Sequence, residues 1–340
     1  MQEEQITRHE VTDERIKEML IQAASSDNLQ ASHNFFSQFE YIHNLQVEKN
    51  HEKTIKNGLN LLETCRRLDL FSYEKLHKGS PFYWIAIASF EVGDFQQATF
   101  FFDAAISEDN KNSPGSKTPA HLFVLMDSSE AAQYGRSLTY RAEFQFGKHV
   151  DDYNEKFHPQ MISKDEIRDK FISKAINSEI EWRSLATSLV SYLLELEDRQ
   201  KILSLRLESG TYEPFYSHLF KGCVLFESLI KCSPYLNANL KSGFIRSADL
   251  SKLLNNRIVR ERLGFDYLLK ISSTLSAIIK EIDDNPDLDK NIINHLELTG
   301  KIRNSITHSW VWNIELSPKN YGSLAKIILH SCFYVINKLF

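Results

Sequence analysis

The chain has 340 residues, of which 42% are apolar and 25% are charged, and its formal net charge is −5. This length and apolar content can fill the cores of two domains. No apolar run approaches membrane-spanning length, and no signal-peptide core follows the polar N-terminus, so we expect a soluble, cytoplasmic protein without membrane association. The four cysteines form no Cys-x-x-Cys pair and show no zinc-site spacing, so we expect reduced thiols and no metal or cofactor.

Apolar residues recur at helical spacing almost throughout the chain, and strand-like alternation is hard to find. With only 12 Gly and 8 Pro, the sequence predicts an all-α fold. The first amphipathic helix is expected over residues 12–24, with Thr12 as its N-cap. Helices over 28–48 and 52–69 should follow as an antiparallel hairpin.

The segment 79–109 is more specific. Ala86 is small enough to let two helices approach closely, Gly93 and Asp94 are turn residues, and Ala98, Phe102 and Ala105 share one helix face. This pattern resembles one tetratricopeptide repeat, and the resemblance implies a short array of helical hairpins. Asn110 stands where that family often has Pro, and Phe82 where it often has Trp.

A polar break over residues 109–119 has the composition of a surface loop and lacks the residue order of a phosphate-binding loop. Helical patterning returns over 120–147, breaks near His158-Pro159, and continues as one long helix over about 164–205. The C-terminal part then predicts helices over 213–232, 264–282, 288–308 and 319–339, with short helices and loops over 235–262.

An arginine, an asparagine and a histidine lie within two turns of the predicted helix over 288–308. Arg303 and Asn304 are adjacent, and His308 follows four residues later. A guanidinium can bind a phosphate through two hydrogen bonds, an imidazole can move a proton near neutral pH, and an amide can orient either group. Metal-independent cleavage of RNA needs these groups.

The motif Arg303-Asn304-x-x-x-His308 resembles the Arg-Asn-x-x-x-His signature of the HEPN superfamily, small helical domains of many prokaryotic ribonucleases. The resemblance implies a metal-independent endoribonuclease of the toxin or phage-defence kind, with Arg303, Asn304 and His308 as its catalytic residues. His308 would move a proton at the ribose 2′-oxygen or the leaving 5′-oxygen, Arg303 would stabilise the phosphate charge, and Asn304 would orient His308 or the phosphate.

On an ideal helix, Arg303 and His308 are about 140° apart in projection, so a single helix does not bring them together. Families that this chain resembles dimerise, and two motif helices then form one composite site. The resemblance therefore implies a homodimer through the HEPN domain. We expect a tetratricopeptide-like domain over residues 1–160, a bridging helix over 161–205 and a HEPN-like domain over 206–340.

Charge is distributed unevenly between the two ends of the chain. Residues 206–340 contain 17 Lys/Arg and 13 Asp/Glu, whereas residues 1–205 contain 23 and 32. The basic part suits a phosphate backbone, and the acidic part suits a protein partner on the N-terminal helical domain. The residues expected to bind RNA are Lys241, Arg246, Lys252, Arg257, Arg260 and Arg262.

Several alternatives stay open at this point. The basic residues could simply solvate a helix face, and Glu227 or Glu297 could either support the catalytic residues or form ordinary ion pairs. Trp310 and Trp312 could stack on a base or pack against the last helix. The whole chain could also be a non-catalytic adaptor that uses both of its parts for protein contacts.

Overall fold

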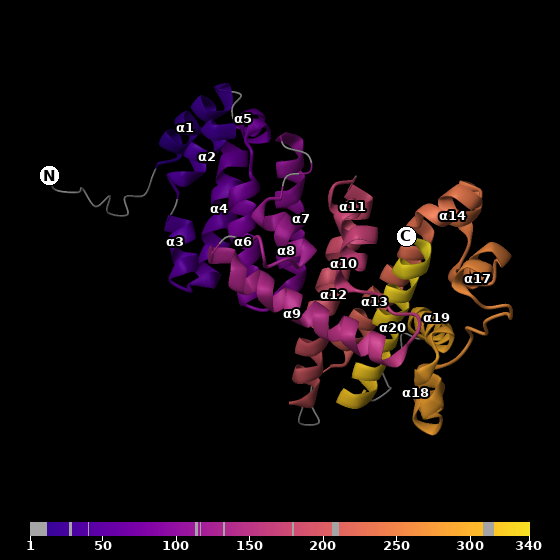
Figure 1. The fold of residues 1–340 in the computed structure, drawn as a ribbon. Helices are drawn as coiled ribbons and strands as arrows, with labels where there is room; N and C mark the ends of the chain where they lie inside the picture. The colour runs from indigo at the N-terminus through magenta and orange to yellow at the C-terminus, as the bar shows by residue number, and fades with distance from the viewer. Residues whose placement is uncertain are drawn as a thin grey trace. The chain divides into compact units, whose positions relative to one another are not determined.

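The fold is helical throughout the part of the chain that the structure describes. This computed structural model describes residues 12–26, 29–39, 41–112, 115, 117–131, 133–178, 180–205, 211–308 and 316–340; at 133, 134, 180, 181 and 308 it describes the backbone alone. No strand occurs within these ranges, so the all-α prediction is confirmed (Figure 1). None of the helices described is both long and apolar enough to cross a membrane.

Contacts divide the chain into two compact units, Met1–His121 and Leu122–Phe340. The domain boundaries predicted from the sequence, at residues 160 and 205, stay a prediction. The helices of the first unit are α1 (Asp13–Ser25), α2 (Leu29–Ser37), α3 (Tyr41–Val47), α4 (His51–Leu68), α5 (Leu70–Lys75), α6 (Gly79–Glu91) and α7 (Phe95–Asn112), and α8 (Pro119–Leu125) spans its end.

Helices α6 and α7 form a tightly packed hairpin in the first unit. Gly93 makes the turn between them with a φ of 84°, a left-handed conformation that glycine adopts without strain. Ala86 and Ala98 are fully buried, and Phe102 packs edge-on against Tyr83 with the ring centroids 5.9 Å apart. The predicted turn and packing face of this hairpin are therefore confirmed.

The second unit contains the predicted motif. Its helices are α9 (Gln133–Lys156), α10 (Lys164–Ile167), the π-helix η1 (Arg168–Ile172), α11 (Ser173–Ile176), α12 (Ile180–Ser204), α13 (Glu213–Cys232), α14 (Pro234–Asn239), α15 (Ser242–Ser247), α16 (Leu250–Leu254), α17 (Arg257–Leu263), α18 (Leu275–Asp284), the 3-10 helix η2 (Pro286–Lys290), α19 (Ile292–His308) and α20 (Pro318–Leu339).

Helix α20 forms the centre of this unit. It is buried on almost every side and packs against α12, α13 and α19 (Figure 1). Its N-cap is Ser317, whose hydroxyl accepts a hydrogen bond from the backbone N–H of Asn320. A helix that is apolar all round belongs in a core, so the strongly apolar sequence of this segment accounts for its place.

Several predicted helices differ from the structure. The helix expected over 28–48 is divided into α2 and α3, and the helical pattern over 120–147 is divided into α8 and α9, which ends later, at Lys156. The long helix expected over 164–205 is interrupted at Asn177, which ends α11 before α12 begins. The helix expected over 264–282 is wrong for its first half, because Gly264 ends α17 with a φ of 80° and the chain stays irregular up to Thr274. Thr274 then caps α18 through a hydrogen bond from the backbone N–H of Ala277.

A buried carboxylate joins α12 to α13. Glu195 is 3% exposed and accepts hydrogen bonds from Lys221 Nζ at 2.6 Å and from Arg199 Nε at 3.1 Å. Burial opposes its ionisation, but the charge of Lys221 and the hydrogen bonds outweigh this and lower the pKa of Glu195 to about 2. Glu195 is therefore ionised at neutral pH and holds two cations in place.

Two buried histidines stack between α19 and α20. The rings of His295 and His330 are 5.4 Å apart and nearly parallel. His295 Nε2 lies 3.0 Å from Asp289, and His330 Nε2 lies 3.1 Å from Asp152. Their Nδ1 atoms are buried without a hydrogen-bond partner in the described structure. Each Nε2 therefore carries the proton that it donates to its carboxylate, and both rings are neutral.

Substituting Glu195 by Ala should lower the free energy of unfolding by about 3 kcal/mol, because it leaves Lys221 and Arg199 without their counter-ion in a largely buried site. Urea unfolding of the full chain measures this change. Glu197→Ala on the same helix is the control: its partner Lys148 is 60% exposed, so the cost should stay below about 1 kcal/mol. Equal losses in both variants would contradict the account.

The chain should lose stability in mild acid. Burial lowers the pKa of His218 and of His330 to about 4, below the value of about 6.5 in an unfolded chain. Between these values the unfolded state binds more protons, so the free energy of unfolding falls as the pH drops, by about 1 kcal/mol per histidine at pH 5.5. Urea unfolding near pH 7 and pH 5.5 tests this.

His330→Gln should reduce that pH dependence by the share of one histidine, whereas His33→Gln, at an exposed position of α2, should leave it unchanged. If unfolding of the wild type were equally unfavourable at both pH values, the assignment of neutral buried rings would be wrong.

Candidate functional site

Helix α19 carries the predicted motif. Its first turn is capped by Asn291, whose side-chain oxygen accepts a hydrogen bond from the backbone N–H of Ile293 at 2.9 Å. Ile302 is fully buried and Ile306 is half-buried, so the helix is anchored beside its polar residues as the spacing predicts. Because α19 packs against both α13 and α20, its position is fixed relative to the centre of the unit.

Arg303 is held by two side chains. Its Nε donates to Glu227 Oε2 on α13 at 3.1 Å, and its Nη1 donates to Asn304 Oδ1 at 3.3 Å. Glu227 also binds Lys231 through its other oxygen at 2.7 Å. Nη2 of Arg303 has no partner in the described part of the structure, and the side chain is 24% exposed. The guanidinium is thus oriented while one of its nitrogens remains available.

Asn304 anchors backbone as well as orienting Arg303. Its Nδ2 donates to the carbonyl oxygen of Ile271 at 3.0 Å. With both ends of the amide engaged, its described partners are Arg303 and Ile271. The side chain of His308 lies outside the described residues, as do Trp310 and Trp312. The expected pairing of Asn304 with His308 therefore stays a prediction.

An irregular segment over residues 264–274 is fastened to the rest of the second unit by side-chain amides. Asn255 accepts from the backbone N–H of Leu269 at 2.8 Å and donates to its carbonyl oxygen at 3.2 Å. Ile271 packs against Gly300 of α19, where an added Cβ would lie 2.6 Å from Ile271 Cγ2. Gly300 is therefore required for the close approach of this segment to the motif helix.

Further charges surround Arg303. The backbone N–H of Lys252 lowers the pKa of Asp249, the N-cap of α16, and the charge of Arg303 contributes to the same shift. Burial raises the pKa of Cys223, so its thiol stays protonated and is not a nucleophile. Arg303 thus lies near two carboxylates, those of Glu227 and Asp249.

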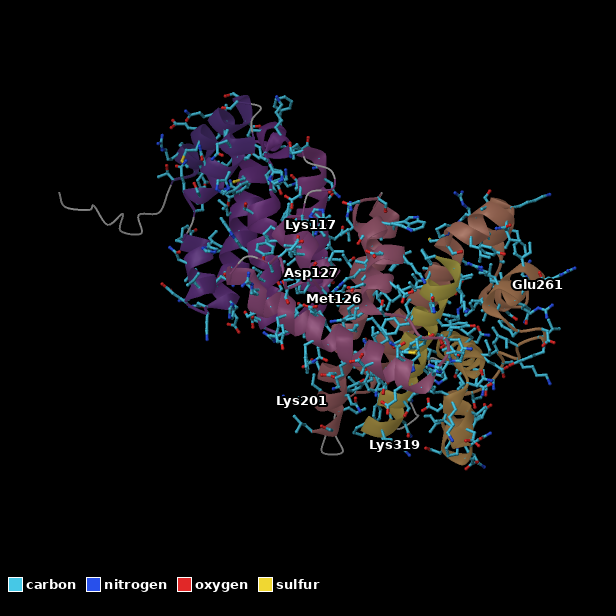
Figure 2. The ribbon with its side chains drawn as sticks, in the orientation of Figure 1. Lys117, Met126, Asp127, Lys201, Glu261 and Lys319 are labelled. Carbon is cyan, nitrogen blue, oxygen red and sulfur yellow. The ribbon has the colours of Figure 1, made fainter. Side chains whose placement is uncertain are left out.

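The six basic residues predicted to bind RNA have different surroundings. Lys241 and Arg246 are exposed and have no ion-pair partner among the residues described. Lys252 and Arg257 are exposed but paired, Lys252 with Asp249 at 3.4 Å and Arg257 with Glu261 at 2.6 Å; Figure 2 labels Glu261 on α17.

Arg260 and Arg262 bind backbone carbonyl oxygens instead. Arg260 donates to Asn255 and Asp266, and Arg262 donates to Lys338 and lies over the ring of Tyr235. These two side chains connect the C-terminal end of α17 to its surroundings. Of the six residues, Lys241 and Arg246 are therefore the two that are exposed and have neither an ion pair nor a backbone carbonyl partner in the described structure.

Of the two candidate supporting carboxylates, only Glu227 reaches the motif arginine. Glu297 pairs with Lys301 at 3.1 Å, and Lys301 also binds Glu281. The sequence does not show which of the two glutamates pairs with Arg303, because Glu227 and Arg303 are 76 residues apart. Within the described ranges, no three His, Cys, Asp or Glu side chains come together as metal ligands could.

Comparison with known proteins adds no further assignment, since no protein-family model, no curated protein and no solved structure matches this chain. The function is therefore argued from the residues of the site.

Substituting Gly300 by Ala should destabilise the second unit by about 1–3 kcal/mol, because the new methyl group overlaps the buried side chain of Ile271. Thermal or urea unfolding measures the loss. Gly243→Ala is the matched control, since a Cβ there meets nothing within 4 Å. This exposed helical position should be neutral or slightly stabilised. A neutral Gly300→Ala would show that the segment over 264–274 is not closely packed on α19.

Proposed function

We propose that this chain is a metal-independent endoribonuclease of the HEPN type, with Arg303, Asn304 and His308 as its catalytic residues. The single observation that carries the proposal is the state of Arg303, which is oriented by Glu227 and Asn304 and keeps Nη2 without a described partner. A guanidinium that is already oriented can stabilise a developing phosphate charge without reorganising during the reaction.

The proposed chemistry uses the ribose of the substrate as the nucleophile. His308 acts as the base at the 2′-hydroxyl or as the acid at the leaving 5′-oxygen. The 2′-oxygen forms a bond to phosphorus while the bond from phosphorus to the 5′-oxygen breaks. This yields a 2′,3′-cyclic phosphate and a 5′-hydroxyl end. Arg303 stabilises the pentavalent phosphate, and Asn304 and Glu227 hold Arg303 in position.

A homodimer through residues 206–340 would complete the site. Phe220 and Val224 lie two turns and one turn before Glu227 on α13, and they are 38% and 42% exposed. Exposed apolar residues at helical spacing beside a polar site support burial against a second copy. In such a dimer the motif helices of both copies would contribute to one composite site.

The other proposed roles rest on the tetratricopeptide resemblance, on the distribution of charge and on the HEPN resemblance. The hairpin of α6 and α7 supports a tetratricopeptide-like domain over residues 1–160, where a protein partner would bind. Lys241 and Arg246, which are exposed and unpaired in the described structure, are the strongest candidates for contacts to an RNA backbone. A cytoplasmic toxin or phage-defence effector is the biological role that we propose.

A non-catalytic adaptor is the second candidate, and one observation favours it. Arg303 is paired with a carboxylate that is only 13% exposed, and Asn304 binds the backbone of Ile271. Both contacts would also suit purely structural residues, in which case both parts of the chain would serve protein contacts.

Cleavage of RNA in the presence of EDTA decides between the two. We expect the wild-type protein to cut total cellular RNA and to leave 2′,3′-cyclic phosphate ends. Arg303→Ala and His308→Ala should each reduce the rate at least about 100-fold, since they remove the phosphate ligand and the proton carrier. Cells that express the wild type should stop growing, whereas cells that express either variant should continue to grow.

Lys280→Ala is the matched control, because it removes an exposed positive charge from α18, outside the motif. It should cleave RNA at the wild-type rate. If all four proteins neither cut RNA nor arrest growth, the adaptor is the better description. If all four cut equally, the activity does not belong to this site.

A further inference from the structure

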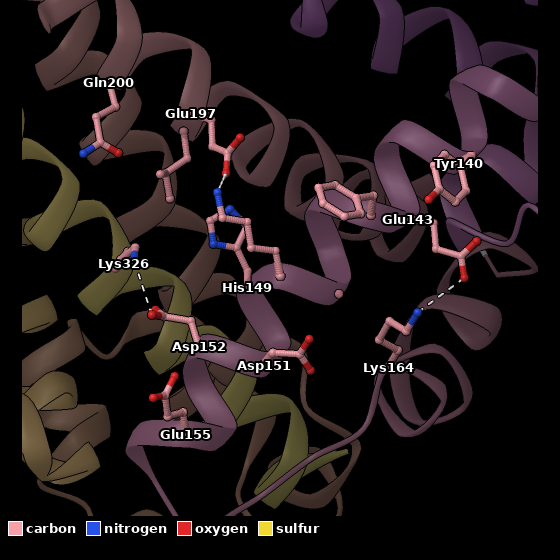
Figure 3. Close-up of a pocket in the computed structure, with 14 residues that line it drawn as sticks. Tyr140, Glu143, His149, Asp151, Asp152, Glu155, Lys164, Glu197, Gln200 and Lys326 are labelled. Carbon is pink, nitrogen blue, oxygen red and sulfur yellow. Dashed lines mark hydrogen bonds and ion pairs between the residues drawn. The ribbon is translucent and has the colours of Figure 1, made fainter.

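A second site lies on the surface of α9, apart from the motif. Residues of α9, α10, α12 and α20 line a cleft of about 800 Å³ (Figure 3). This volume lies in the range of ligand sites, which is roughly 300–1,000 Å³. The cleft contains five carboxylates, those of Glu143, Asp151, Asp152, Glu155 and Glu197.

The three lysines of the cleft are already paired. Lys148 binds Glu197 at 2.5 Å, Lys164 lies 3.4 Å from Glu143, and Lys326 lies 3.3 Å from Asp152, as the dashed lines in Figure 3 show. Each lysine of the cleft is therefore paired with one of the five carboxylates, which leaves two carboxylates of the cleft without a lysine partner.

Asp151 and Glu155 remain without a partner. Both are exposed, and neither has a hydrogen bond or ion pair within the described part of the structure. They lie one turn apart on α9, an arrangement in which like charges destabilise a helix slightly. A positively charged group bound between them would remove this repulsion.

Two exposed aromatic rings extend the same face of α9. Tyr140 is 57% exposed and Phe144 is 59% exposed, and their ring centroids are 6.4 Å apart. Gly147 follows one turn later and adds no side chain of its own to this face; the side chain of Lys164, which is paired with Glu143, lies beside it. Carboxylates beside exposed ring faces suit a guanidinium, which binds carboxylates bidentately and stacks on aromatic rings.

His149 provides an independent sign that the cleft accepts a ligand. It lines the cleft and is only 2% exposed, yet its Nε2 has no hydrogen-bond partner in the described structure. Figure 3 shows it between Glu197 and Asp152. Burial lowers the pKa of His149 to about 4, so the ring is neutral and can donate or accept a hydrogen bond. Most buried polar groups have a hydrogen-bond partner, so an unpaired ring nitrogen at the wall of this cleft supports the binding of a ligand.

We propose that this cleft binds an arginine-containing segment of a partner protein. Its guanidinium groups would pair with Asp151 and Glu155 and stack on Phe144 and Tyr140. The proposal is independent of RNA cleavage at Arg303. An acidic cleft repels a nucleic acid, so charge complementarity selects a basic peptide as the occupant.

The dimensions fit an extended peptide. Asp151 and Glu155 are about 6 Å apart along the helix axis, the spacing of every second residue in an extended chain. From Tyr140 to Glu155 the face measures about 22 Å, which about seven extended residues would cover. Arginines at alternate positions would therefore reach both carboxylates and the rings.

Fluorescence anisotropy with the full chain tests the proposal. The probe is a fluorescein-labelled nonapeptide in which arginine alternates with glycine. We expect it to bind, with an affinity that falls as salt is added. Asp151→Asn combined with Glu155→Gln should weaken binding at least about tenfold, because two charged hydrogen bonds are lost. Tyr140→Ala combined with Phe144→Ala should also weaken it.

Glu213→Gln combined with Asp284→Asn is the matched control. It removes the same charge from two exposed carboxylates outside the cleft and should leave the affinity unchanged. A peptide with glutamate in place of arginine should not bind. Absence of binding by the arginine peptide, or equal weakening by both charge variants, would overturn the proposal. The proposal would also be overturned if an oligouridylate probe bound the wild type and the combined Asp151→Asn and Glu155→Gln substitutions abolished that binding.

Discussion

The burial of α20 on nearly all sides is the constraint on which the second unit depends. A helix in that position must satisfy its polar side chains inside the bundle. Tyr321 lies 2.8 Å from the ring of His218 on α13, Ser331 lies 2.9 Å from Thr299 on α19, and His330 binds Asp152 on α9. Each of these bonds fixes a different neighbouring helix against α20, so polar pairing sets the arrangement that apolar burial stabilises.

The position of the candidate site follows from this arrangement. Helices α13 and α19 both pack against α20 and against each other, which places Glu227 opposite Arg303. On the other side of α19, Gly300 admits Ile271, and Asn304 binds its backbone. The guanidinium of Arg303 is thus oriented by groups whose own positions are fixed by the core, the condition that an oriented charge requires.

Sequence periodicity predicts the fold where burial alone decides the structure. The apolar pattern locates α13 and α20 to within a residue because both helices are strongly buried. The apolar pattern wrongly predicts a helix over 264–274. Here the side-chain amides of Asn255 and Asn304 form hydrogen bonds with backbone groups that would otherwise bond within a helix. Such bonds join residues far apart in sequence, and no local pattern contains them. Likewise, the motif identifies Arg303, but only the fold identifies Glu227 as its partner.

The positions of the charged residues in the fold are a further property that the sequence alone does not give. The sequence divides into an acidic part and a basic part, and the second unit contains residues of both. Residues 122–205 carry 14 Asp/Glu and 11 Lys/Arg, whereas residues 206–340 carry 13 and 17. Within this one unit, the exposed carboxylates of Asp151 and Glu155 lie on α9, and the exposed cations Lys241 and Arg246 lie beside and within α15. Charges separated by more than about 10 Å are largely screened in physiological salt, so the groups nearest to a surface determine what binds there. A basic peptide and a polyanion could therefore bind the same unit without competing for the same residues.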